Sequence, residues 1–75
     1  MGTKNKPGAF DCYANAEPDE PMFVLLARDK RAPDLVRRWA VERLGGASES
    51  KEDVSKAHEA FECAAAMEEW RKKNR

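Results

Sequence analysis

The clearest pattern in the chain is the helical spacing of apolar positions in its second half. Between Pro33 and Gly45, one face collects Leu35, Val36, Trp39, Ala40 and Leu44. Spacings of three and four residues bring such positions onto one side of an α-helix. Proline fits a first helical turn, where its missing N–H has no helical partner anyway, and the Gly45-Gly46 pair is a common helix stop. The pattern predicts a helix over residues 33–44.

A second periodic stretch predicts the longest element of the chain, from about residue 50 to residue 73. Its apolar positions recur every three or four residues, as Val54, Ala57, Phe61, Ala64, Met67 and Trp70. Ser50, with Asp53 three residues later, resembles a capping box, in which side chains satisfy the free N–H groups of a first turn. The basic residues after Trp70 suit the negative end of the helix dipole.

The apolar run Met22–Ala27 is short, so its periodicity fits a buried helix and a buried strand equally. A helix over residues 21–29 is favoured, because acidic residues precede Pro21 as they do at helix starts, and only Val24 is β-branched. The alternative is a short strand at residues 22–28 packed on the two longer helices.

The N-terminal part of the chain shows little periodicity. Residues 10–17 have room for one or two helical turns with Asp11 as the cap, and two prolines then separate them from the next element. Residues 1–9 contain turn formers, so a flexible N-terminal tail is expected there. The chain therefore divides into this tail and a single small helical domain at residues 10–75.

Together these elements predict a mainly α fold, a small three-helix arrangement of residues 21–29, 33–44 and about 50–73. In the alternative, the first of the three is a strand and the two long helices remain. The predicted core consists of Phe23, Leu26, Val36, Trp39, Leu44, Phe61 and Met67.

The length of the chain limits how much of this apolar surface can be buried. A domain of 75 residues buries only about 60% of the surface that its unfolded chain exposes, and self-association is a common remedy. Apolar residues make up 41% of the chain, which argues against disorder along its whole length. The bulky anchors available are Phe10, Phe23, Trp39, Phe61 and Trp70.

The charges balance but are segregated. Lysine and arginine together number 14, as do aspartate and glutamate, so the formal net charge is zero, which argues against strong non-specific binding to nucleic acid. Residues 28–43 hold six basic residues against three acidic ones, whereas residues 44–70 hold seven acidic residues against two lysines. Most such charge is expected on solvated helix faces.

The cysteine content and the hydropathy indicate a cytoplasmic protein. A small secreted scaffold normally carries four or more cysteines, and this chain has two, Cys12 and Cys63. Neither an apolar leader nor a membrane-spanning apolar run is present in the sequence, so no membrane association is expected. In a reducing compartment both thiols are expected to be free.

The residue types that carry catalysis or bind metal are sparse. His58 is the only histidine, and its spacing of five residues from Cys63 turns the two side chains apart on a helix. A structural zinc site needs four ligands, and nucleophilic catalysis needs a nucleophile, a base and an orienting group in contact. No catalytic, metal-binding or cofactor-binding residue is therefore predicted, and no small-molecule ligand.

Two stretches of the chain resemble a known sequence pattern. The residues Glu20-Pro21-Met22-Phe23-Val24-Leu25-Leu26-Ala27-Arg28-Asp29, then Ala32-Pro33, then Val36 and Trp39-Ala40, look like a pattern in small proteins of phages and prophages. The ending Ala66-Met67-Glu68-Glu69-Trp70 resembles their C-terminal A-M-x-x-W signature. From its first to its last matched residue, 20–70, the resemblance spans about two thirds of the chain. It implies a phage or prophage setting, and no activity, cofactor or catalytic residue comes with it.

These observations favour a non-enzymatic accessory protein that acts by protein–protein interaction, either with a protein partner or with a second copy of itself. Met67 and Trp70 are the candidate interface, since large apolar side chains on a terminal turn need a cover and Trp is a frequent hot spot. The alternative is a small nucleic-acid-binding helical protein that uses the basic segment 28–43, with Arg31, Arg37 and Arg38 as phosphate contacts.

Overall fold

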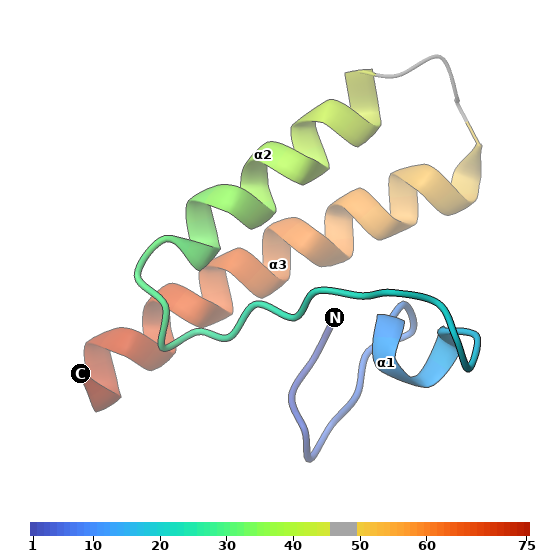
Figure 1. Ribbon diagram of the computed structural model, residues 1–75. Coiled ribbons are helices and arrows are strands. Elements are labelled where there is room, and N and C mark those ends of the chain that lie inside the picture. Colours follow the sequence, from blue (N-terminus) through green and yellow to red (C-terminus); the bar gives the residue numbers. More distant parts are fainter. Residues whose placement is uncertain (46–49) are drawn as a thin grey trace.

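A computed structural model of the chain describes residues 1–45 and 50–75, and within them it contains three helices and no strand (Figure 1). Helix α1 spans Cys12–Asn15, α2 spans Ala32–Gly45 and α3 spans Lys51–Asn74. The predicted mainly α, three-helix fold is confirmed. In Figure 1, α2 and α3 form an antiparallel pair, and the chain between α1 and α2 runs along α3.

The two long helices begin and end close to the predicted residues. Pro33 lies in the first turn of α2, and Gly45 is its last residue, while Gly46 lies outside the described residues. At the start of α3, the Ser50 side chain accepts a hydrogen bond of 3.1 Å from the backbone N–H of Asp53, as a capping residue does. Helix α3 therefore begins where its cap predicts.

The prediction of a helix over residues 21–29 is wrong, and the strand alternative at 22–28 is also absent. The third helix is α1, one turn long, within the predicted 10–17 segment. After Pro21 only a few residues remain before a turn, closed by a 3.0 Å hydrogen bond from Asp29 N–H to the Leu26 carbonyl. A helix this short is unstable in water, and no neighbouring strand lies among the described residues to pair with the segment.

The seam between α2 and α3 is built from alanine. Among the described residues, the fully buried apolar side chains are Ala32, Ala40, Ala57, Ala60 and Ala64. Small side chains let two helix backbones approach closely, so the closest contact of the pair forms where the side chains are shortest. Partly buried Met1, Val36 and Phe61 pack against this alanine seam.

The predicted core of large side chains is therefore largely wrong. Val36, Phe61 and Met67 are half-buried, but Leu26, Trp39 and Leu44 are exposed, and Phe23 leaves 82% of its surface in solvent. The large residues lie beside the alanine seam rather than in it, and within residues 1–45 and 50–75 no third layer of helices covers them. The radius of gyration, 12.8 Å, exceeds the about 11 Å expected for a compact domain of this length.

The N-terminal segment is held by polar contacts. The Met1 ammonium pairs with the carboxylates of Asp11 and Glu59. Asp11 is the N-cap residue of α1 as predicted, but its carboxylate accepts hydrogen bonds from Gly8 N–H at 2.8 Å and Gly2 N–H at 3.1 Å instead of capping the helix. These contacts tie the segment to α1 and α3. The predicted flexibility of residues 1–9 is a separate property, and it stays a prediction.

Candidate functional site

The segment Met22–Leu26 presents apolar side chains and unused backbone groups to solvent. Phe23 and Val24 expose 82% and 54% of their surfaces, and Met22 and Leu26 about half. Among the described residues, the backbone groups of residues 21–25 make no hydrogen bond within the chain. An extended backbone whose N–H and C=O groups have no partners offers the same free donors and acceptors as the edge strand of a sheet.

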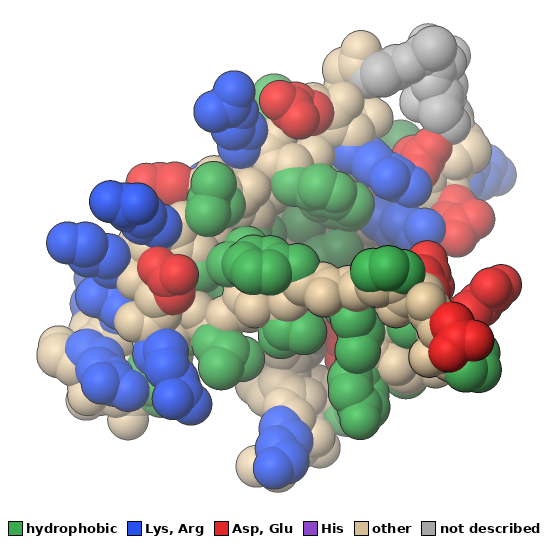
Figure 2. All heavy atoms as spheres, in the orientation of Figure 1, with side chains coloured by type: hydrophobic (Ala, Val, Ile, Leu, Met, Phe, Trp, Pro, Cys, Tyr) green, Lys and Arg blue, Asp and Glu red, His purple; other side chains and the backbone are tan. Residues whose placement is uncertain are grey.

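An apolar groove of about 1490 Å³ runs between this segment and the helices. Leu35, Val36 and Trp39 line it from α2, and Cys63 and Met67 line it from α3. The lining from the rest of the chain includes Phe10, Tyr13, Phe23, Val24, Leu25 and Leu26. Figure 2 shows apolar side chains gathered on this face, over the extended segment and α2. We call this surface the apolar face.

The structure separates the two residues of the predicted interface. Met67 is half-buried and lines the groove of the apolar face. Trp70, one turn later on α3, is 42% exposed and does not line that groove, and the Arg75 guanidinium lies 5.8 Å from its ring centroid. Met67 therefore belongs to the apolar face, whereas Trp70 lies among basic residues at the C-terminal end of α3.

The three arginines of the nucleic-acid alternative also lie in different surroundings. Arg37 donates two hydrogen bonds to Glu68 on α3, one of them 3.1 Å long, and Arg38 lies 3.6 Å from Glu42 on its own helix. Arg31 precedes α2, and its side chain makes no ion pair among the described residues. The pairing of Arg37 with Glu68 raises the pKa of Arg37 and leaves its charge engaged inside the fold.

The Met1 ammonium is the centre of a second polar cluster. Hydrogen bonds and charge attraction from Asp11 and Glu59 raise its pKa, against the opposing effect of burial. The hydrogen bond from Met1 also lowers the pKa of Asp11. Beside this cluster is a hollow of about 580 Å³, with His58 and Glu62 on its wall. Asp11 and Glu59 are both engaged by the Met1 ammonium, so the cluster serves to position the N-terminal segment.

The groups that carry chemistry are scattered across the described residues. Cys12 is exposed and Cys63 half-buried, both with free thiols, and burial raises the pKa of Cys63. His58 makes no hydrogen bond or ion pair with the described part of the chain. Within residues 1–45 and 50–75, no three His, Cys, Asp or Glu side chains are arranged to hold a metal ion.

None of the helices in the described part of the chain is long and apolar enough to cross a membrane.

Sequence reasoning placed Phe23 in the core and did not identify the apolar face that it helps to form. One signal pointed towards this face: the apolar run is flanked by prolines, which prevent its joining a longer helix. The position of Asp11 at the centre of a polar cluster had no comparable signal, because its partners come from both ends of the chain.

No protein-family model, no curated protein and no solved structure matches the chain.

Proposed function

We propose that this chain is a non-enzymatic accessory protein that works by binding another protein chain on its apolar face. The observation that carries the proposal is the contiguity of large exposed apolar side chains around one groove, from Phe23 and Val24 to Leu35 and Trp39. Isolated exposed apolar residues are ordinary, but a contiguous patch of this kind is typical of an interaction site.

The occupant that we propose is a second copy of the chain. Residues 21–25 offer free backbone donors and acceptors, and two copies of one segment can pair antiparallel about a two-fold axis. No charged residue lies between Glu20 and Arg28, so pairing buries no charge in the segment itself. Because the net charge is zero, long-range repulsion does not oppose the association. The alanine seam leaves large side chains uncovered, and a dimer would cover them.

Light scattering coupled to size-exclusion chromatography tests this proposal. We expect the wild type to shift from monomer to dimer as its concentration rises, and Val24→Lys to remain monomeric. Val41→Lys is the matched control, because Val41 is 59% exposed against 54% for Val24 but does not line the groove. Circular dichroism of both variants verifies that the helices persist.

Two results would count against the second copy. One is a wild type that stays monomeric at every accessible concentration. The other is equal loss of the dimer in Val24→Lys and Val41→Lys, which would place the contact away from the groove. In the first case, binding of a foreign protein that Val24→Lys abolishes and Val41→Lys retains would identify the apolar face as a heterotypic interface.

The genomic and cellular setting is a separate part of the proposal. A phage or prophage origin is supported by the resemblance of residues 20–40 and 66–70 to phage proteins, and inspection of neighbouring genes tests it. A cytoplasmic location is supported by the two free thiols, which suit a reducing compartment. Fractionation of cells that express a tagged chain tests the location.

A further inference from the structure

Unpaired cations gather at one end of the molecule. The loop before α2 and the last turns of α3 bring together Arg28, Lys30, Arg31, Arg71, Lys72, Lys73 and Arg75. Among the described residues, none of these side chains forms an ion pair with a carboxylate. Figure 2 shows the basic side chains gathered over this end, which we call the basic end.

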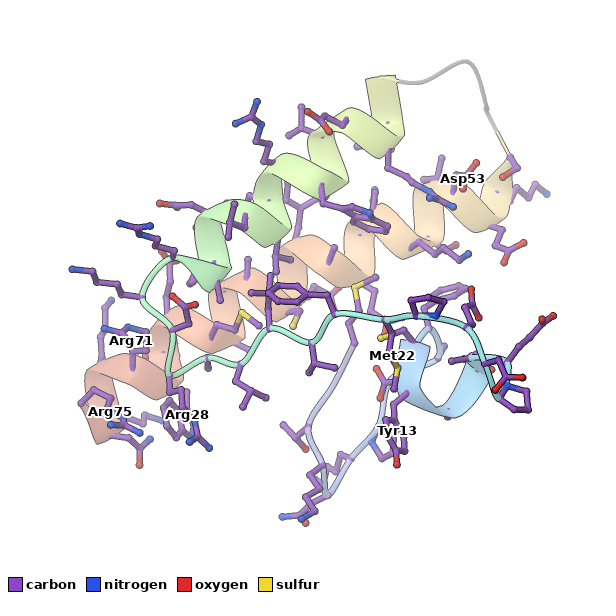
Figure 3. All side chains as sticks on the ribbon, viewed as in Figure 1. Tyr13, Met22, Arg28, Asp53, Arg71 and Arg75 are labelled. Carbon is purple, nitrogen blue, oxygen red and sulfur yellow. The ribbon has the colours of Figure 1, made fainter. Side chains whose placement is uncertain are left out.

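A direct contact joins the two parts of the basic end. The Arg71 guanidinium on α3 donates a hydrogen bond of 2.6 Å to the backbone carbonyl of Arg28 in the loop. Figure 3 shows Arg28, Arg71 and Arg75 side by side there, on the opposite side of the view from Tyr13. Residues more than forty positions apart in sequence thus contribute to one positive surface.

Most basic residues elsewhere on the two long helices are neutralised within the fold. Arg37, Arg38, Arg43 and Lys56 each pair with a carboxylate. The Arg37 guanidinium also pairs with Glu68 and so offsets the charge of that carboxylate in the turn before Trp70. The local field at the basic end is therefore positive although the chain as a whole is neutral.

An exposed aromatic ring lies within the basic end. Trp70 leaves 42% of its surface in solvent, and Arg75 lies against its ring. Proteins that bind single-stranded nucleic acid combine cations for the phosphates with aromatic rings on which bases stack. An acidic peptide would use the cations but has no general need for the indole, and a duplex keeps its bases stacked on one another.

From this combination we infer that the basic end binds single-stranded nucleic acid, with the cations on the phosphate backbone and Trp70 stacked on a base. The site is distinct from the apolar face. Of the three arginines that the sequence suggested as phosphate contacts, it includes Arg31 and neither Arg37 nor Arg38. It does not depend on self-association, because neither Trp70 nor any cation of the basic end lines the apolar groove.

Fluorescence anisotropy with a labelled oligothymidylate at low ionic strength tests the inference on the full chain. We expect saturable binding that weakens as the salt concentration rises. A plot of the logarithm of the association constant against the logarithm of the salt concentration should have a slope of about −0.7 for each phosphate contact. Lys72→Glu with Lys73→Glu should abolish binding. The double variant Lys4→Glu with Lys6→Glu makes the same charge change away from the basic end and should change the affinity little.

The stacking component has its own readout. Trp70→Ala should weaken binding about tenfold, as expected for loss of one base–aromatic stack. In a Trp39→Phe background Trp70 is the only tryptophan, and its fluorescence should be quenched by the oligonucleotide.

Three results would overturn the inference: no binding at low ionic strength, equal affinity for polyglutamate, or duplex binding as tight as single-strand binding with no effect of Trp70→Ala. Self-association that persists in the Lys72→Glu, Lys73→Glu variant would show that the two surfaces act separately. Val24→Lys should retain the oligonucleotide binding.

Discussion

Arg37 on α2 and Glu68 on α3 form a bidentate ion pair across the two long helices. Both terminal guanidinium nitrogens donate to the carboxylate, one at 3.1 Å. Arg43 and Asp53 form a second link between the same helices, at 2.9 Å. Because α2 and α3 are antiparallel, the two ion pairs lie towards opposite ends of the alanine seam. Together they link the two helices at two points along a seam of small side chains.

The Arg37–Glu68 pair is expected to make the stability of the fold depend on pH. Its hydrogen bonds lower the pKa of Glu68, so the ionised carboxylate is favoured in the folded state. A carboxyl group whose folded pKa is depressed adds stability above its unfolded pKa, about 4.3, and loses it as the pH falls through the folded value. Glu68→Gln should therefore reduce the free energy of unfolding at neutral pH, and its difference from the wild type should shrink in acid.

Urea unfolding followed by circular dichroism at neutral and acidic pH measures this difference. Glu69→Gln is the control, because Glu69 is exposed and makes no ion pair among the described residues. The same loss in both variants, independent of pH, would show that the Arg37–Glu68 pair does not stabilise the fold.

The alanine seam should not tolerate a larger side chain. Ala60 is fully buried between α2 and α3, so Ala60→Leu has to separate the helices or distort their side chains. Overpacking of this kind costs about 1–3 kcal/mol of unfolding free energy. Ala65→Leu is the matched control on the exposed side of the same helix and should be nearly neutral. Chemical denaturation of both variants provides the comparison, and equal stability of the two would argue against close helix contact at Ala60.

Substitution by alanine should stabilise the fold at Gly45 and destabilise it at Gly8. Gly45 is helical, and a methyl group there would meet no atom within 4 Å, so Gly45→Ala should stabilise the protein by about 0.5–1 kcal/mol. At Gly8, the methyl group would meet the Glu59 carboxylate and the Met1 ammonium. Gly8→Ala should cost about 1 kcal/mol by displacing the N-terminal segment. Thermal unfolding measures both changes, and a stabilised Gly8→Ala variant would contradict the Met1–Glu59 contact.

The two thiols should differ in reactivity. Cys63 is half-buried and burial raises its pKa, so less of it is present as the reactive thiolate at neutral pH. Alkylation of Cys63 in a Cys12→Ser variant should be slow and should accelerate only at higher pH than for free cysteine. The exposed Cys12, measured in a Cys63→Ser variant, should react faster. Mass spectrometry over time measures both rates, and faster modification of Cys63 would show that it is not shielded.

The two long helices could be predicted because their signals are local. Ser50 with Asp53, Pro33 and Gly45 mark helix ends through contacts within a turn or two, and apolar spacing marks the helical stretches between them. The core could not be predicted in the same way. Trp39 and Ala40 adjoin each other on one apolar face, and the rotation of α2 against α3 decides which of them is buried.

The candidate sites show the same limit. Met67 and Trp70 were selected together as large residues near the end of α3, but their separation depends on where the chain before α2 passes. The grouping of Arg28 with Arg71 likewise depends on a long-range contact that no sequence spacing encodes. The pairing of Arg37 with Glu68 is also tertiary, so the arginine that looked available in the sequence is already engaged.

The alanine seam also determines how this protein can change under selection. In most cores the damaging substitutions are truncations, because large side chains fill the interior and their loss leaves a void. At Ala40, Ala57 and Ala60 almost nothing remains to truncate, and nearly every substitution adds atoms. A saturation mutagenesis screen for stability should therefore show that these positions accept only glycine and serine. At Phe23 and Val24 the same screen should accept many residues, and only a screen for binding should restrict them.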